Sequence, residues 1–422
     1  MRMRRRLCSP WQVMPSLLDK LRASQPGKKP SSAPEKPAAE GCLIREKRFP
    51  CHEFPARPLK ADSLRLMTGR ESLSDIDPSS LLFLDTETTG LNGGAGTVAF
   101  LIGLGQFSGD EFVVTQYLMR DYDEEPFVLA PVLEALSRCE AVVTFNGASF
   151  DMPLIQSRLT MNRMHGAYEA PDNIDLVHIA RRVFKMRVRP CKLTQLESEI
   201  FNTPREDDLP GSEVPARYFT YIKTREAALL EDIIEHNAQD IVSMARLMYA
   251  LVNLHERPLE AADQRDLYSL GRVFEKRGEG ERAKACFRLC RDSGVRDLAQ
   301  LRLSEILRRE GNAREAAEGY ERLRLSGRGG AKVYIALAKL YEHRFRDPAR
   351  ALAIARQGMI YCLEALDGGG AESREYQDLA YRSRRLIEKN GGHKHGLDGQ
   401  LQNTSGAFQA SEGRHTGCEA GV

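Results

Sequence analysis

The feature that most constrains the fold is a repeat of 33–34 residues in the last third of the chain. An offset of 33 residues aligns four apolar positions in pairs: Leu270 with Leu303, Phe274 with Leu307, Ala283 with Ala316 and Phe287 with Tyr320. A third copy follows after 34 residues, with Leu337 and Tyr341 in step. Each repeat of this length is one unit that buries its apolar face only by stacking on its neighbours. The repeat therefore predicts an all-α region of stacked helix pairs over residues 264–388.

This pattern resembles tetratricopeptide repeats, whose period is about 34 residues. The resemblance implies a concave helical surface that suits a protein partner. We expect Tyr376–Ile387 to form a capping helix. Cys286 and Cys290 lie four residues apart on one predicted helix. Buried packing explains these two cysteines better than redox or metal chemistry does.

Over residues 78–255, the sequence predicts a mixture of strands and helices. The apolar run Leu81–Leu84 predicts a buried strand, and a turn at Ser108-Gly109-Asp110 predicts a hairpin of Val98–Phe107 with Glu111–Leu118. The later predicted elements are a helix at Glu124–Ser137, a strand at Ala141–Phe145, and helices at Phe150–Leu159, Ile174–Val183 and Arg225–Leu254. Antiparallel strands followed by strand–helix alternation predict an α/β domain with a mixed sheet.

The flanking segments have the composition of unfolded chain. Residues 1–41 are basic and rich in Pro, Ser and Lys, and residues 389–422 are rich in Gly, Ser and Gln. We expect both to be largely disordered. Residues 42–77 form a lead-in for which the sequence predicts no firm element.

Net charge is distributed unevenly. It is +10 over residues 1–70, −13 over residues 71–255 and +5 over residues 256–422. The acidic middle argues against a module that binds nucleic acid by charge alone, and it is compatible with carboxylates around metal ions. The basic start is either a solvated tail or an arm that touches phosphate.

The chain lacks signs of secretion or membrane insertion. Its nine cysteines are scattered, which does not suit a disulfide framework. It has no run of ~18 consecutive apolar residues. We therefore predict a cytoplasmic protein that does not contact a membrane.

Carboxylates follow the predicted strands. Asp85 and Glu87 end the first strand and, as residues i and i+2, point to the same side. Asp151 opens the helix after the strand that leads into Asn146; taken alone, it could complement the helix dipole while Ser149 caps the helix.

A histidine and a further carboxylate share one face of the long predicted helix. His236 and Asp240 lie four residues apart there. Taken alone, they could be an exposed pair. Together with Asp85, Glu87 and Asp151, they indicate a site of oxygen ligands for two hard cations such as Mg²⁺ or Mn²⁺. His236 is then the expected general base.

These residues resemble the active site of the DEDD exonucleases of the ribonuclease-H-like superfamily, and the histidine indicates their DEDDh branch. Five segments resemble the YprB-type ribonuclease-H-like domain of bacteria: FLDTETTGLNGGAGTVAFLIGLG, TFNGASFDMPLIQSR, DLVHIARRVF, REDDLPGSEVPARYF and EHNAQDIVSMARL. The resemblance covers about residues 78–255 and implies a ribonuclease-H-like mixed sheet flanked by helices. It also implies Asp85, Glu87 and Asp240 as ligands of the first metal ion, with Asp85 and Asp151 at the second.

A basic strip follows in the same domain, over residues 181–192. It is either a solvated helix end or a contact surface for the substrate backbone. The predicted substrate-binding residues are Asn146, Arg181, Arg182 and Lys185. Asp172 and Asp175 are expected to cap the helix before the strip, and Asp207 and Asp208 fit either a turn or an approach to the site.

We therefore predict a metal-dependent 3′–5′ exonuclease that acts on nucleic acid and carries a short helical repeat module. Two alternatives remain open. One is a nucleic-acid-binding or scaffold protein with a weakly active nuclease fold that acts through its repeats. The other is a structure-selective endonuclease that uses the same metal chemistry.

Overall fold

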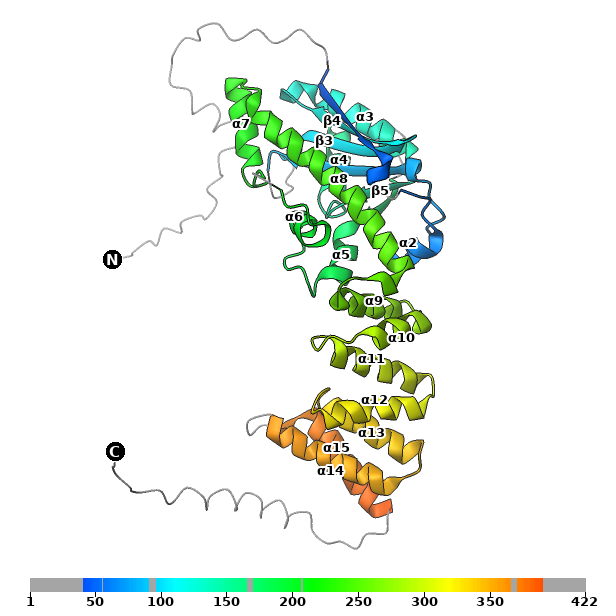
Figure 1. Ribbon diagram of the computed structural model, residues 1–422. Helices are drawn as coiled ribbons and strands as arrows, with labels where there is room; N and C mark the ends of the chain where they lie inside the picture. Colours follow the sequence, from blue (N-terminus) through cyan, green and yellow to red (C-terminus); the bar gives the residue numbers. More distant parts are fainter. Residues whose placement is uncertain are drawn as a thin grey trace, which may run out of the picture. The chain divides into compact units, whose positions relative to one another are not determined.

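The computed structural model describes residues 41–54, 56–90, 96–164, 170–205, 208–365 and 370–389 (Figure 1). The strands are β1 Leu43–Pro50, β2 Leu81–Thr88, β3 Ala99–Ser108, β4 Glu111–Leu118, β5 Ala141–Thr144 and β6 Asp172–Asp175. The helices of the same domain are α2 Ala61–Thr68, α3 Glu125–Arg138, α4 Asp151–Met161, α5 Leu176–Phe184, α6 Leu193–Leu196, α7 Val214–Thr224 and α8 Ala228–Glu256. The C-terminal helices are α9 Gln264–Lys276, α10 Gly280–Leu289, α11 Arg296–Arg309, α12 Ala313–Leu325, α13 Ala331–His343, α14 Pro348–Ala365 and α15 Arg374–Lys389.

The strands form one six-stranded mixed sheet in the order β1-β4-β3-β2-β5-β6. β1, β4, β3 and β2 pair antiparallel, whereas β2, β5 and β6 pair parallel. The predicted mixed sheet, the hairpin and the strand at Leu81–Leu84 are confirmed. β2 is longer than predicted, because its last residues still pair with β3 although they are polar.

The central strand β2 separates two apolar layers. Leu82 and Leu84 belong to the layer under α3, α4 and α7, and Leu81 and Phe83 belong to the layer under α2 and α5. Helix α8 crosses the sheet and contacts β2, β3 and β4 (Figure 1). A strand that is apolar on both faces is therefore covered by helices on both faces, as its continuous apolar run requires.

Several local elements differ from the sequence analysis, which predicts neither α6 nor α7. Residues 42–77, for which no element is predicted, contain β1 and α2. β1 lies at the sheet edge and has four consecutive charged residues in its middle, so its pairing with β4 rather than its composition makes it a strand. Asp172–Asp175 forms β6, and α5 begins only at Leu176.

Helix α5 starts there because the Asp175 carboxylate accepts a hydrogen bond from the backbone N–H of Val177. The predicted cap at Asp175 is therefore confirmed. Asp172 does not cap the helix, since it lies at the start of β6 and forms an ion pair with Arg70 at 3.1 Å.

The C-terminal region consists of packed helix pairs, as predicted: α9 packs on α10, α11 on α12, and α13 on α14. Cys286 and Cys290 are buried in it. The predicted capping helix is present as α15, which packs on α14. Helix α9 also contacts α5 of the sheet domain, and one apolar core runs from the sheet into the helix pairs.

The segments predicted to be disordered, 1–41 and 389–422, lie outside the described residues except for Gly41 and Lys389. In the part of the chain that the structure describes, no helix is long and apolar enough to cross a bilayer.

Candidate active site

Asp85 and Glu87 lie at the carboxyl end of β2, where their side chains share one face of the strand. β3 pairs with β2 so that Gly103 stands directly opposite Asp85, and Gly105 stands opposite Phe83. A glycine has no side chain to fill the space above the sheet at these two positions. Helix α8 occupies that space.

The close approach of α8 is visible at Gly103. A Cβ atom there would lie 2.2 Å from Asn237 Oδ1 and 2.3 Å from Ile241 Cδ1. Because Gly103 leaves this room, Asn237 Nδ2 reaches Asp85 and donates to its carboxylate at 2.8 Å. Gln116 Nε2 in turn donates to Asn237 Oδ1 at 2.8 Å. Two buried amides therefore orient the Asp85 carboxylate.

Asp151 comes to the same edge of the sheet from β5. It is 7% exposed, and the Thr86 hydroxyl donates a hydrogen bond to its carboxylate. The turn between β5 and α4 is tight, because a Cβ atom on Gly147 would lie 2.7 Å from Asp151 Oδ2. The interpretation that Ser149 caps α4 is wrong, since Phe150 occupies the N-cap position and no side chain caps this helix.

Asn146 shapes this turn through its backbone. Its φ is +71°, and its N–H donates to Asp175 Oδ1 at 2.8 Å. Ala148 N–H donates to the other Asp175 oxygen at 3.1 Å. Asp175 therefore holds both the start of α5 and the turn before Asp151.

His236 lies on α8 with its ring between carboxylates. Its Nε2 atom is 4.0 Å from Glu87 Oε1 and 3.9 Å from Asp240 Oδ2. Its Nδ1 atom is 2.7 Å from Asp208 Oδ1. A proton on Nδ1, shared with Asp208, leaves Nε2 free to accept a proton on the side of Glu87 and Asp240.

A buried arginine also reaches this group. The Arg205 side chain is 4% exposed and makes a two-pronged contact with Glu197, at 2.6 and 2.5 Å. Its guanidinium also donates to the Asp240 carboxylate. Asp240 is therefore paired with a cation from the loop that precedes α7.

The pKa values of the carboxyl groups are raised because the groups are buried and lie close to one another. Burial raises the pKa of Asp85 well above its usual range, and the charges of Asp240, Asp151 and Glu87 raise it further. Burial also raises the pKa of Glu87 to about 8, with added repulsion from Asp240, Asp151 and Asp208. Burial raises the pKa of Asp151 to about 6, against the opposing effect of the hydrogen bond from Thr86. The groups lie close enough for each to oppose ionisation of the next.

The donor chemistry of this cluster fits a divalent cation. Carboxylate oxygens are the ligands of hard ions, and a cation would remove the repulsion that the pKa values report. As the side chains lie, internal partners hold them: Asn237 holds Asp85, Thr86 holds Asp151 and Arg205 holds Asp240. Within the described residues, no three His, Cys, Asp or Glu side chains are gathered so that they could hold a metal ion. Metal binding would therefore require some of them to turn away from their present partners.

The predicted substrate-binding residues on α5 have different surroundings. Arg182 is partly buried and donates to the backbone carbonyl of Met67 at 2.6 Å, which ties α5 to α2. Arg181 and Lys185 are exposed. A contact between these residues, or Asn146, and a substrate stays a prediction.

The sequence analysis missed six contributors to the site: Thr86, Gln116, Glu197, Asn237 and Arg205 entirely, and Asp208 as a partner of His236. Asn237 stands next to His236, but an asparagine inside a helix carries no signal of its own. The only available hint was the acidic loop before Pro210, which was equally consistent with a turn.

Comparisons with known proteins agree with this architecture. Residues 82–252 match the family model described as the RNase_H superfamily. The matched range contains Asp85, Glu87, Asp151, His236 and Asp240.

The chain is also 29% identical over 368 residues to Uncharacterized protein YprB of Bacillus subtilis (strain 168). The similarity covers 83% of this chain and 86% of that protein. A similarity of this length extends beyond residues 82–252, so it includes part of the sequence outside the RNase H-like domain.

Proposed function

We propose that the chain is a metal-dependent nuclease that hydrolyses phosphodiester bonds in DNA or RNA, working from the 3′ end. The observation that carries the proposal is that Asp85, Glu87, Asp151 and Asp240, from β2, α4 and α8, lie close enough to repel one another, with His236 beside Glu87 and Asp240. The match to the RNase_H superfamily supports the same reaction class.

In this proposal, the four carboxylates would hold two Mg²⁺ or Mn²⁺ ions, which would supply positive charge at the phosphate and at the leaving oxygen. His236 accepts a proton from the attacking water at Nε2, while Asp208 holds Nδ1. The water oxygen forms a bond to phosphorus as the bond from phosphorus to the leaving 3′ oxygen breaks. The leaving oxygen takes up a proton, and the released nucleotide carries a 5′ phosphate.

The proposal is tested with 5′-labelled single-stranded DNA, duplex DNA and RNA, each with Mg²⁺, Mn²⁺ or a chelator. A ladder that shortens from the 3′ end, and disappears with chelator, is expected. Asp85→Asn and Asp240→Asn should each lower the rate by roughly 10²-fold or more, because each loses a charge that holds the cation. Parental rates in both folded variants would contradict the site assignment.

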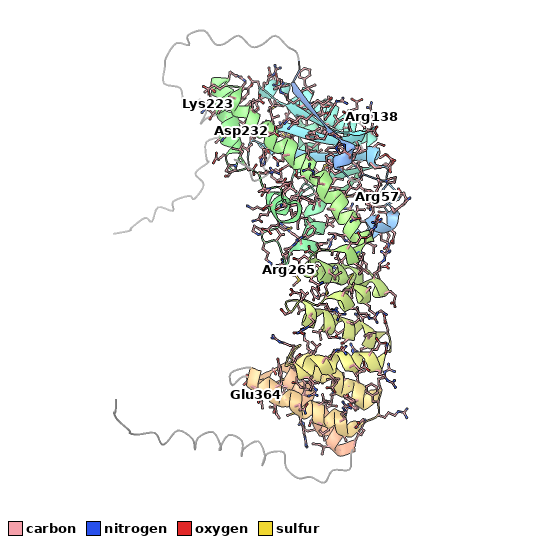
Figure 2. All side chains as sticks on the ribbon, viewed as in Figure 1. Arg57, Arg138, Lys223, Asp232, Arg265 and Glu364 are labelled. Carbon is pink, nitrogen blue, oxygen red and sulfur yellow. The ribbon has the colours of Figure 1, made fainter. Side chains whose placement is uncertain are left out.

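Asp232→Asn is the matched control. Asp232 lies on the same helix α8 but its side chain is 63% exposed and pairs with Arg217 (Figure 2). A surface pair of this kind contributes little, so this variant should cleave like the parent. Binding of nucleic acid without cleavage would favour the scaffold alternative, and internal cuts would favour an endonuclease.

A further inference from the structure

Arg205 is fixed by a buried anchor. Both Glu197 oxygens accept from its guanidinium, and the two side chains are 4% and 2% exposed. Glu197 opens the helical turn Glu197–Phe201, which continues α6. Two-pronged arginine–carboxylate pairs are the strongest and most directional of ion pairs. The guanidinium therefore has a defined place rather than a range of surface positions.

The remaining N–H groups of Arg205 point into the carboxylate cluster. Nη2 donates to the Asp240 carboxylate, and Nη1 lies 3.3 Å from Asp208 Oδ1. Nη1 also lies 3.2 Å from His236 Nδ1. The protein thus places a permanent positive charge of its own beside a carboxylate that is expected to bind a metal ion.

A divalent cation and this guanidinium compete for the same partner. The Asp240 oxygen that faces Arg205 cannot serve both fully, and the two positive charges repel across a short, poorly solvated distance. Conversely, without a metal ion, the Arg205 guanidinium balances the negative charge of Asp240 through their direct contact.

We propose that Arg205 is an internal counterion that occupies Asp240 when no metal is bound and must leave it when a divalent cation enters. This inference rests on the proposed function, since it takes Asp240 as a metal ligand. The guanidinium stays attached to Glu197 while its contact with Asp240 is exchanged. Arg205 thereby lowers the metal affinity of the free site.

The test is Mn²⁺ binding to the full chain, measured by calorimetry and by the electron paramagnetic resonance of free Mn²⁺. Arg205→Met should bind Mn²⁺ about 10-fold or more tightly than the parent, a coupling in the usual range for two competing ligands. Arg205→Lys, which keeps the charge, should bind with an affinity between the two. Arg217→Met, which removes a half-buried arginine of α7 that pairs with Asp232, should leave the affinity unchanged.

Two further variants keep the test decisive. Arg205→Met leaves Glu197 buried without its partner, so the double variant Glu197→Gln/Arg205→Met removes both charges in case the single variant does not fold. In an Asp240→Asn background, Arg205→Met should no longer increase the Mn²⁺ affinity, because the carboxylate for which Arg205 and the ion compete is absent.

The outcomes separate the two proposals. If the parent binds Mn²⁺ as tightly as the folded Arg205 variants do, or more tightly, the counterion role is wrong. The proposed function would still stand. Binding of Mn²⁺ by none of the proteins would overturn both.

Discussion

Glu87 and Asp151 are carboxyl groups whose ionisation opposes folding when no cation is present. Their pKa values in the folded chain, about 8 and about 6, are higher than the values of about 4 expected in the unfolded chain. Between these limits, the folded chain binds more protons than the unfolded chain does. The free energy of unfolding contributed by these groups therefore falls as pH rises from about 4 to about 8.

We predict that Glu87→Gln stabilises the metal-free chain at pH 8 by about 1–3 kcal/mol, with little effect at pH 4. The free energy of unfolding is measured by denaturant titration in chelator across this pH range. An equal dependence on pH in parent and variant would show that Glu87 ionises in the folded chain as it does in the unfolded chain.

Mn²⁺ should reverse this trend. Because the ion binds the ionised carboxylates of the folded chain, it should raise the melting temperature of the parent more at pH 8 than at pH 6. Differential scanning calorimetry with and without Mn²⁺ checks this. A melting temperature that Mn²⁺ raises equally at both pH values would contradict the prediction.

In the proposed mechanism, Asp208 acts on the reaction through its contact with His236. We predict that Asp208→Asn lowers the cleavage rate by about 10- to 100-fold, because the ring loses the charge that orients it and holds a proton on Nδ1. The dependence of the rate on pH should shift, and Asp208→Glu should restore part of the rate. Asp232→Asn serves again as the control. An unchanged pH dependence in Asp208→Asn would mean that the 2.7 Å contact with His236 has no part in catalysis.

At the scale of elements, the site depends on the contact between α8 and β3. Gly103 lets the helix lie close enough for Asn237 to reach Asp85. We predict that Gly103→Ala costs about 1–3 kcal/mol of folding free energy, because α8 must move away from the added methyl group. Mn²⁺ affinity should fall with it, since Asp240 moves with the helix.

The control for this change is Gly211→Ala. A Cβ atom on Gly211 would have no neighbour within 4 Å, so stability and Mn²⁺ affinity should stay at parental values. Denaturant titration and calorimetry compare the two variants. Equal stability of Gly103→Ala and Gly211→Ala would show that α8 adjusts without cost.

At the scale of the whole described unit, the sheet domain and the helix pairs meet through a buried ion pair. Arg187, which follows α5, lies 2.7 Å from Asp266 on α9, with side chains 19% and 4% exposed. Burial raises the pKa of Asp266 to about 7, while the charge of Arg187 opposes the shift. The positive charge of Arg187 therefore stabilises the ionised form of the Asp266 carboxyl.

We predict that Arg187→Ala destabilises the chain by about 3–5 kcal/mol at pH 8, because it leaves a buried carboxylate unpaired. The loss should be smaller at pH 5, where Asp266 is protonated, and smaller in an Asp266→Asn background. Arg265→Ala, which removes an exposed arginine of α9, is the control (Figure 2). The same loss in both backgrounds would show that the two residues do not depend on each other.

Several parts of this protein follow from local sequence alone. A four-residue apolar run predicts β2, a Gly-Asp turn predicts the hairpin, and a repeat of 33–34 residues predicts the helix pairs. Such patterns depend on residues that are near one another in the sequence. The meeting of Asp85, Glu87, Asp151, His236 and Asp240 was predicted from their combined chemistry and from the resemblance to DEDD exonucleases. Local periodicity contributed only that Asp85 and Glu87 share one side of a strand, and that His236 and Asp240 share one helix face.

Tertiary structure alone decided what surrounds these residues. β1 is a strand only because β4 pairs with it, and Asn237 is a partner of Asp85 only because Gly103 lets α8 approach. Arg205 is buried against Glu197 and Asp240, 8 and 35 residues away, so nothing in its own neighbourhood distinguishes it from an exposed arginine. Sequence periodicity determines which side chains share a face, whereas the charge, burial and hydrogen bonds of a site depend on elements that meet only in the folded chain.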